Sequence, residues 1–259
     1  MQTIFETQTN TRLNKNEFRN RAYGCYVSGF KQAVTTSNAG DLISAQRYRR
    51  YLNRRLTPWL QAMPKNASIA DLGCGDGMLL RVFQEMGFEN LQGVEASPEM
   101  HRLCQVTFPA VEQGDLRAYL RNKVGAFNVI ALFDVLEHFT REEAVELLEE
   151  VNAALRPGGL FLLQLPNGDS PFAQAVFAGD ITHETLYTRG SLSHLLTMGG
   201  FELIEVDEHS PEPMDLRSLV RWAGWQCLRR AIALLHRIET GGVSSGIYTR
   251  VMRAAARKS

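Results

Sequence analysis

Short apolar runs alternate with helix-like stretches along most of this chain. From residue 68 onward, each run of strand length is followed by a stretch whose apolar residues recur every three or four positions. This alternation favours a parallel sheet with helices on both faces. The run at residues 160–165 is almost entirely apolar, as expected for a strand buried on both sides. The pattern predicts seven strands, at residues 68–70, 91–96, 113–116, 127–133, 160–165, 201–206 and 247–254.

Capping residues define the ends of several predicted helices. Thr140 and Glu143 have the spacing of a capping box, in which a side chain at each position satisfies a backbone N–H group of the other. They precede a predicted helix at residues 144–155. Thr188 is expected to cap another helix, which runs to Met198 and ends at a glycine pair.

The first 64 residues are predicted to form a helical segment ahead of the sheet, which belongs to a second unit at residues 65–259. Helical periodicity covers residues 17–60, with a glycine and serine break near residues 37–40. Five aromatic side chains stand out in this segment: Tyr23, Tyr26, Tyr48, Tyr51 and Trp59. Two roles remain open for them. They pack the helices on the sheet, as aromatic residues mainly do, or they cap the ligand site and contribute a tyrosine to it.

A helical insertion at residues 211–242 separates the sixth and seventh predicted strands. Its core is a helix at residues 216–238, whose apolar stripe comprises Leu216, Val220, Ala223, Cys227, Ala231, Leu234 and Ile238. We expect this stripe to pack on the domain. Off the stripe lie Arg217, Arg221, Arg229, Arg230, Arg237, Trp222 and Trp225. These arginines and tryptophans also suit a contact surface along residues 214–238, either for a homodimer or for an anionic membrane face.

Composition and charge describe an ordinary soluble globule. Of the 259 residues, 44% are hydrophobic and 22% are charged, and 28 Lys and Arg balance 28 Asp and Glu. The zero net charge gives no overall attraction to nucleic acid or to a membrane. The four cysteines are widely spaced, which argues against a disulfide framework or a zinc site. The sequence shows no apolar leader and no run of membrane-spanning length, so we predict a cytoplasmic protein.

The strongest chemical signal is the stretch Asp71-Leu72-Gly73-Cys74-Gly75-Asp76-Gly77, between the first strand and a helix. Its glycines allow positive φ angles and the close approach of a ligand, and the free N–H groups of the following helix point toward the turn. Dinucleotide-binding turns space their glycines as G-x-G-x-x-G, whereas this turn reads G-x-G-x-G with an acid ahead of it. That carboxylate would repel a pyrophosphate and attract an ammonium group. A nucleoside with a cationic amino-acid end, such as S-adenosylmethionine, fits this description.

Further acidic residues follow the next strands. Glu95, followed by Ala96, lies about 20 residues beyond the turn, where an acid accepts hydrogen bonds from ribose hydroxyl groups. Asp115, followed by Leu116, closes the third predicted strand. The fourth strand ends at Phe133 and continues into Asp134-Val135-Leu136-Glu137-His138.

Together these motifs resemble the class I S-adenosylmethionine-dependent methyltransferases. The glycine turn resembles the family's first motif, residues 134–138 its D-V-L-E-H element, and residues 156–159 its R-P-G-G turn. The resemblance implies a doubly wound, Rossmann-like α/β fold with a seven-stranded sheet in the order 3-2-1-4-5-7-6, the last strand antiparallel. It implies S-adenosylmethionine as cofactor and S-adenosylhomocysteine as product, with Asp115 at the adenine amino group. The implied cofactor site comprises Asp71, Gly73, Cys74, Gly75, Glu95, Ala96, Asp115, Leu116 and Phe133.

Two histidines are the candidate catalytic residues, because an oxygen or nitrogen nucleophile must lose a proton during methyl transfer. His183 follows the fifth strand, on the side of the sheet where doubly wound folds bind ligands. It acts either as the base or as a residue that pins the loop. Residues 179–184 resemble a G-D-x-T-H-E element of a subgroup often associated with bacterial polysaccharide or secondary-metabolite pathways. His138 belongs to an element whose histidine more often orients the loop than reacts. No cluster at ligand spacing indicates a metal.

The predicted function is methyl transfer to an oxygen or nitrogen atom of a small-molecule or glycan-linked acceptor. No nucleic acid is expected, because the fourth strand is not followed by an N-P-P-Y motif or a cysteine, and no basic patch with interleaved aromatic residues is present. Two alternatives remain. One is a protein of this fold that binds the cofactor or acts as a scaffold without turnover, and the other is an NAD-dependent oxidoreductase, whose glycine spacing differs.

Overall fold

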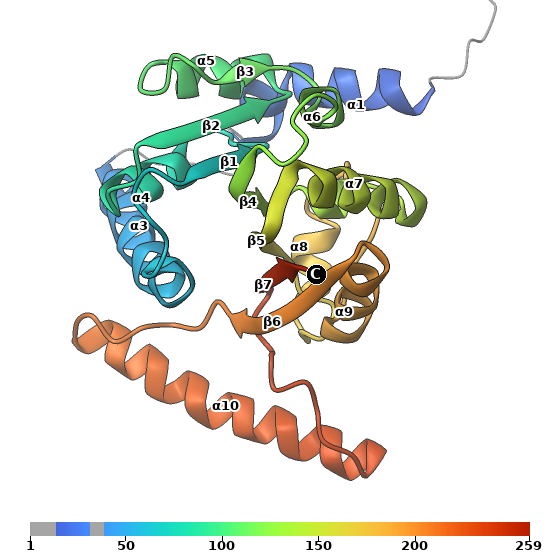
Figure 1. Ribbon diagram of the computed structural model, residues 1–259. Coiled ribbons are helices and arrows are strands. Elements are labelled where there is room, and N and C mark those ends of the chain that lie inside the picture. The colour runs from blue at the N-terminus through green and yellow to red at the C-terminus, as the bar shows by residue number, and fades with distance from the viewer. Residues whose placement is uncertain (1–13, 32–38) are drawn as a thin grey trace, which may run out of the picture.

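A seven-stranded sheet in the order β3-β2-β1-β4-β5-β7-β6 forms the centre of the protein (Figure 1). The computed structural model describes residues 14–31 and 39–259. Neighbouring strands from β3 to β5 pair in parallel, whereas β7 is antiparallel to both β5 and β6. This confirms the predicted order and the antiparallel last strand. The strands are β1 (Ser68–Leu72), β2 (Asn90–Glu95), β3 (Glu112–Gln113), β4 (Phe127–Phe133), β5 (Leu155–Pro166), β6 (Phe201–Glu208) and β7 (Val251–Lys258).

Helices cover both faces of the sheet, as the alternating pattern predicted. α3 and α4 pack on one face, and α7 and α9 pack on the other (Figure 1). The helices are α1 (Lys15–Gly24), the π-helical η1 (Tyr26–Lys31), α3 (Ala39–Leu60), α4 (Met78–Glu85), α5 (Pro98–Gln105), α6 (Leu116–Leu120), the 3₁₀-helical η2 (Leu136–His138), α7 (Arg141–Ala154), α8 (Ala173–Phe177), α9 (Arg189–Met198) and α10 (Leu216–Thr240).

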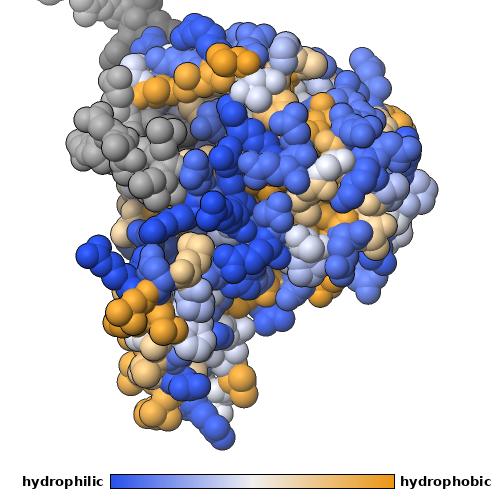
Figure 2. Space-filling model, turned by 90° about the vertical axis from the view of Figure 1, so that its left-hand side faces the viewer, coloured by the Kyte–Doolittle hydropathy of each residue, from blue (hydrophilic) through white to orange (hydrophobic). Residues whose placement is uncertain are grey.

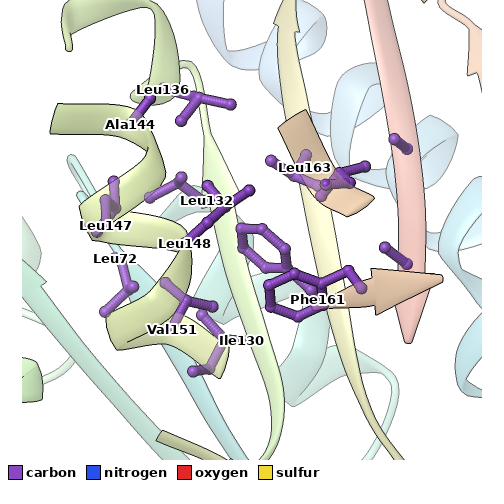
Figure 3. Packing of buried hydrophobic residues seen from close by; sticks show 14 of the residues in the cluster. Leu72, Ile130, Leu132, Leu136, Ala144, Leu147, Leu148, Val151, Phe161 and Leu163 are labelled. Carbon is purple, nitrogen blue, oxygen red and sulfur yellow. The ribbon is translucent and has the colours of Figure 1, made fainter. Parts of the chain in front are cut away.

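Successive residues of β4 and β5 point to opposite faces of the sheet and so divide the core into two layers. In β4, Ile130 and Leu132 face α7, whereas Val129 and Ala131 face α3 and α4. Figure 3 shows the first layer, in which residues of α7 pack against side chains from β1, β4 and β5. All four of these β4 side chains are fully buried. This two-sided burial is the reason that the central strands read as nearly continuous apolar runs.

The predicted caps are present. The Thr140 side chain accepts a hydrogen bond from the backbone N–H of Glu143, whose carboxylate accepts one from the N–H of Thr140. Thr188 caps α9 through the N–H of Ser191. The turn predicted at residues 156–159 is instead counted within β5, with Gly158 at a φ of 70° and an irregular register against the start of β4.

The bounds of β3 and β7 also differ from the prediction. β3 ends at Gln113, and Asp115 instead caps α6 by accepting a hydrogen bond from the N–H of Ala118. A short acidic side chain that can bond to nearby backbone favours such a cap over a strand. β7 begins at Val251, later than predicted, because the side-chain amide of Asn167 occupies the carbonyl groups of residues 247 and 249.

The N-terminal segment is helical where the structure describes it. α1 is tied to α7, since Lys15 and Arg19 both pair with Glu143. Of the break predicted near residues 37–40, residues 37 and 38 lie outside the described residues, and Gly40 lies within α3. The proposed division of the chain at residue 64 stays a prediction.

The prediction for the inserted helix is confirmed in its position and wrong in its packing. α10 spans Leu216–Thr240, but all seven residues of the predicted apolar stripe are exposed to solvent. The opposite side of the helix meets the domain, where Trp225 donates a hydrogen bond from its indole nitrogen to Glu208 of β6. Arg229 forms an ion pair with the same carboxylate. A buried acid on the edge strand thus turns the polar side of α10 inward. No helix among the described residues is long and apolar enough to cross a membrane.

Candidate cofactor and acceptor site

The glycine turn leads from β1 into α4 with a backbone that only glycine adopts easily. Gly73, Gly75 and Gly77 have φ angles of 77°, 57° and 81°. A Cβ atom on Gly73 would lie 2.5 Å from Cγ2 of Val135, and one on Gly77 would lie 2.9 Å from the sulfur of Cys104. The turn therefore brings bare backbone to the surface of the site.

The turn opens onto a cavity of about 370 Å³ at the carboxyl ends of the parallel strands. All nine residues of the predicted cofactor site line this cavity: Asp71, Gly73, Cys74, Gly75, Glu95, Ala96, Asp115, Leu116 and Phe133. They converge because β1 lies between β2 and β4 in the sheet, so that the loops after these strands meet at one edge. Their individual roles in binding stay predictions.

Glu95 joins the end of β2 to the glycine turn. One carboxylate oxygen accepts a hydrogen bond of 2.8 Å from the N–H of Gly75, and the other accepts one of 2.7 Å from the N–H of Ser97. Hydrogen bonds to an ionised acceptor are short and comparatively strong. Glu95 therefore fixes the turn and the start of α5 relative to each other.

Asp71 provides a test of whether a cationic ligand fits this site. Its side chain is only 2% exposed, and no described residue bonds to its Oδ2 atom. Burial raises the pKa of this carboxyl well above its ordinary value. A buried carboxylate oxygen without a partner is costly, and the ammonium group of S-adenosylmethionine would supply the missing donor and lower the pKa again. The residues at this cavity fit that cofactor.

The N-terminal segment forms part of the cavity wall, which the sequence offered as one of two roles for its aromatic residues. Tyr23, Tyr26 and Tyr48 line the cavity, whereas Tyr51 of α3 is buried in the core layer that α3 and α4 form with the sheet. Burial raises the pKa of Tyr23 and of Tyr48 to about 12, and it raises that of Tyr26 as well. The three phenols therefore stay protonated near neutral pH, and the hydroxyl groups of Tyr26 and Tyr48 donate to Asp180 and Gln164. The segment therefore has both roles, since three of its tyrosines line the cavity and Tyr51 packs in the core.

Gln164 and Asp134 form a polar corner that the sequence prediction did not include. The Gln164 amide donates a hydrogen bond of 2.9 Å to Asp134, and the Tyr48 hydroxyl lies 3.2 Å from the amide oxygen. Asp134 has a φ of 55°, the only positive value of a non-glycine residue in the described part of the chain, and such strained backbone clusters at functional sites. One sequence feature could have indicated Gln164, because it is the one polar residue in the apolar run at 160–165. No sequence feature indicated Arg19, which also lines the cavity.

His138 lies on the cavity wall and is held through the loop that follows β5. Its Nδ1 atom is 2.8 Å from the Thr182 hydroxyl, which donates its own hydrogen to Asp180. The Thr182 oxygen therefore accepts the Nδ1–H of His138. Burial, with a smaller contribution from His183, lowers the pKa of His138 to about 4. The ring is thus neutral near pH 7, with Nε2 unprotonated.

His183 does not line the cavity. Its ring centre lies 4.8 Å from that of His138, and its Nδ1–H donates a hydrogen bond of 2.9 Å to the carbonyl of Phe177. The adjacent N–H groups of Glu184 and Thr185 both donate to the carbonyl of Glu137. These contacts resemble those of a loop-pinning residue, the second of the two roles left open by the sequence.

Glu137, His138 and His183 bring possible metal-ligand atoms within 4.8 Å of one another. No sequence motif indicates this group, since Glu137 and His183 lie far apart along the chain. One nitrogen of each ring already bonds to protein, through Thr182 and Phe177. Burial raises the pKa of Glu137 well above its ordinary value. We assign no ion here, and the absence of a metal stays a prediction.

Comparisons with known proteins bear on the family of this chain. A family model described as a methyltransferase domain matches residues 45–206, more than half of the chain. A tRNA (carboxymethyluridine(34)-5-O)-methyltransferase from Mus musculus is 31% identical over 111 residues, which cover 42% of this chain and 16% of the relative. A ubiquinone biosynthesis O-methyltransferase from Xanthomonas axonopodis pv. citri is 27% identical over 127 residues, covering 45% of this chain and 51% of the relative. The chain thus spans at most about half the length of these two relatives.

Solved structures with the same fold cover most of the chain. A SAM-dependent methyltransferase from Archaeoglobus fulgidus has a TM-score of 0.63 at 21% identity, covering 85% of this chain and 100% of that one. The 1,6-didemethyltoxoflavin-N1-methyltransferase of Burkholderia thailandensis, solved with S-adenosylhomocysteine bound, has a TM-score of 0.57 at 16% identity, covering 95% and 91%. At such identities the likeness shows the fold. With the family match over residues 45–206, it leads to the conclusion that this chain belongs to the methyltransferase-domain family and that its cofactor is S-adenosylmethionine.

Proposed function

We propose that this protein transfers a methyl group to an oxygen or nitrogen atom of a small-molecule or glycan-linked acceptor. The observation that carries the proposal is the single cavity shared by the nine predicted cofactor residues and three tyrosines. The cofactor supplies a methyl group bound to a positively charged sulfur. At about 370 Å³, the cavity is in the ordinary range for small-molecule sites, roughly 300–1,000 Å³. Only a small acceptor, or the reacting end of a larger one, fits such a space beside the cofactor.

The protein's own side chains supply orientation around that space. Tyr23, Tyr26 and Tyr48 are protonated phenols on its wall, suited to hold the acceptor by hydrogen bonds. Fixing two reactants in line contributes much of the rate enhancement in a displacement reaction. The tyrosines come from the N-terminal segment, whereas the predicted cofactor residues lie at the ends of strands β1 to β4 and just after them. Acceptor choice and cofactor binding therefore use separate parts of the chain.

Between the two predicted catalytic histidines, position favours His138. It lines the cavity in a neutral form with Nε2 unprotonated, so this atom is the candidate to take the proton from the acceptor's O–H or N–H group. Bound S-adenosylmethionine would supply the methyl carbon that bonds to this oxygen or nitrogen while the carbon–sulfur bond breaks, and the electron pair of that bond would leave on sulfur in S-adenosylhomocysteine. His183, which packs beside His138, is proposed as a positioning residue.

The acceptor class is argued from the charge of the chain and from the motif at residues 179–184. Relatives that match only part of the chain are named for methylating a tRNA nucleoside and for ubiquinone biosynthesis. We keep nucleic acid outside the proposal, because the zero net charge of this chain provides no general attraction to phosphates. The resemblance of residues 179–184 to enzymes of polysaccharide and secondary-metabolite pathways supports a small or glycan-linked acceptor. A cytoplasmic location is part of the same proposal.

Calorimetry and labelled cofactor test this function in sequence. The protein is expected to bind S-adenosylmethionine and S-adenosylhomocysteine but not NAD, and Glu95→Ala is expected to weaken binding by about 1–3 kcal/mol through lost hydrogen bonds. Incubation with methyl-labelled S-adenosylmethionine and fractionated cell extract, with total tRNA as a separate sample, then identifies the acceptor. Binding of NAD alone would contradict the cofactor assignment, and label in tRNA alone would contradict the acceptor class.

The assignment of the base is tested separately, by single-turnover rates with the acceptor so identified. His138→Ala is expected to lower the rate roughly 10²–10⁴-fold, the usual contribution of a positioned base. His183→Ala is expected to lose thermal stability and acceptor affinity while keeping most of the rate at saturation. The opposite ranking would return the base to His183. Cofactor affinity serves as the control, since neither ring belongs to the nine residues of the cofactor site.

A further inference from the structure

The inserted helix α10 presents an apolar face that no described residue covers. Leu216 and Ile238, near its two ends, are 76% and 72% exposed, and Val220 and Leu234 between them are also exposed. In Figure 1 the helix lies past the β6 edge of the sheet, outside the layers of the core. Figure 2 shows hydrophobic colour gathered over the lower end of the molecule, the level that α10 occupies. Contiguous exposed apolar surface of this kind usually marks an interaction site.

The outward direction of this face follows from how α10 is anchored. Successive residues of a helix turn by about 100°, which places Trp225 and Arg229 on the side opposite the stripe. These two side chains bind Glu208, and Arg229 also donates to the carbonyl of Gly246. Asp215 caps the first turn of the helix, and Gly241, in a left-handed conformation, ends it. The helix is therefore complete and fixed, with its apolar stripe turned away from the protein.

Charge distinguishes the possible occupants of this face. α10 contains five arginines and a single acidic residue, Glu239. Arg217, Arg230 and Arg237 border the apolar stripe and are exposed. Trp222 is partly exposed as well. A helix with an apolar stripe bordered by cations and a tryptophan matches the boundary between the acyl chains and the headgroups of an anionic bilayer.

A second copy of the chain fits this face less well. Joining two copies through their stripes would bring together two helices that each carry five arginines and one acidic residue. Like charges placed together across an interface are unfavourable, and Glu239 alone cannot balance them. A position across the bilayer is also excluded for α10, because it is not apolar enough to span.

We propose that α10 is an interfacial helix that binds the surface of a membrane containing anionic lipids. Its apolar stripe enters the boundary of the acyl chains, its bordering arginines meet the lipid phosphates, and the sheet stands above the surface. A groove lined by Tyr48, Arg47 and Arg221 lies between α10 and the body, and Tyr48 also lines the cofactor cavity.

Flotation of the full chain with lipid vesicles tests the proposal without any acceptor. Vesicles of phosphatidylcholine are compared with vesicles in which about a quarter of the lipid is phosphatidylglycerol. The protein is expected to float with the anionic vesicles only, and less so as salt is raised, because salt screens charges at the surface. Absence of binding, or equal binding to both kinds of vesicle, overturns the proposal.

Variants then assign the binding to the helix. Each arginine near an anionic surface contributes about fivefold in affinity, so Arg217→Ser, Arg230→Ser and Arg237→Ser together should weaken binding about 100-fold. Leu234→Glu combined with Ile238→Glu should abolish it. Val124→Glu, which changes a residue 77% exposed on a distant turn, is the matched control and should bind as the wild type does. Unchanged binding by the helix variants overturns the proposal, as does a sedimenting dimer that Leu234→Glu dissociates.

Discussion

The glycine-turn edge of the sheet and the inserted helix α10 show two different relations between a sequence pattern and its surroundings. At the sheet edge, acids and glycines from four segments of the chain line one cavity. In α10 the apolar periodicity is equally clear, yet its apolar side faces solvent while Trp225 and Arg229 hold the opposite side. Periodicity establishes that a helix has an apolar face. It does not establish what that face contacts.

Replacement of one leucine by alanine in the sheet core and one in α10 should change the free energy of unfolding by different amounts. Leu132→Ala removes a fully buried side chain from between the sheet and α7 and should cost about 2–5 kcal/mol of the free energy of unfolding. Leu234→Ala, on the exposed stripe of α10, should change it by less than about 0.5 kcal/mol. Urea unfolding of both variants measures the two values. A large loss of unfolding free energy for Leu234→Ala would show that the stripe is packed in solution. It would contradict the difference drawn here between α10 and the core.

Replacement of a glycine by alanine should lower the free energy of unfolding at the glycine turn and raise it in α10. Gly73→Ala forces an alanine into positive φ and against Val135, for a cost of about 2–4 kcal/mol and a loss of cofactor binding. Gly224→Ala, in the middle of α10 with open space around it, should stabilise the protein by about 0.5–1 kcal/mol through helix propensity. Thermal unfolding and calorimetry with S-adenosylmethionine decide both. Destabilisation by Gly224→Ala would mean that a partner approaches α10 closely at that point.

The junction between the two regions should respond to acid. His209, just after β6, stacks on Tyr51 and Tyr48 at ring-centre distances of 4.4 and 5.6 Å. Burial lowers its pKa to about 4, and the charges of Arg253, Arg55 and Arg250 act in the same direction. Between about pH 6.5 and pH 4 the unfolded chain gains this proton before the folded one does, so the contribution of His209 to stability is lost as the pH falls.

His209→Asn removes that dependence. From pH 7 to pH 5, the variant should lose about 1–2 kcal/mol less unfolding free energy than the wild type. Comparing two proteins cancels the opposite trend of Asp71 and Glu137, whose pKa values are raised by burial. Equal losses in both proteins would show that His209 is already solvated, and that the base of the insertion opens more than the structure indicates.

Much of the cofactor site was predictable because its residues lie in short, contiguous motifs. A turn that needs positive φ requires glycine, and an acid at the end of a parallel strand reaches the ligand edge whatever the surrounding helices do. The acceptor side was less predictable. Arg19 and Gln164 reach the cavity from segments far apart in the sequence, and their positions depend on the packing of α1 and β5.

The ranking of the two histidines shows the same limit. His183 had the more suggestive sequence context, but the fold sets His138 on the cavity wall and His183 behind the Phe177 carbonyl. Local sequence places a residue on a loop after a strand. The direction of its side chain depends on contacts made by the loop with η2, which no local pattern specifies.

The sequence by itself determined the strand order, the cofactor-binding turn and the extent of the inserted helix, because each follows from local periodicity, glycine geometry or a resemblance carried by contiguous residues. The tertiary structure alone decided which tyrosines reach the cavity, which histidine lines it and which side of α10 faces outward. These outcomes depend on contacts between distant segments, such as Glu208 of β6 with Trp225 and Arg229. A buried carboxylate must be satisfied by polar partners, and that requirement, rather than the apolar stripe, oriented the helix.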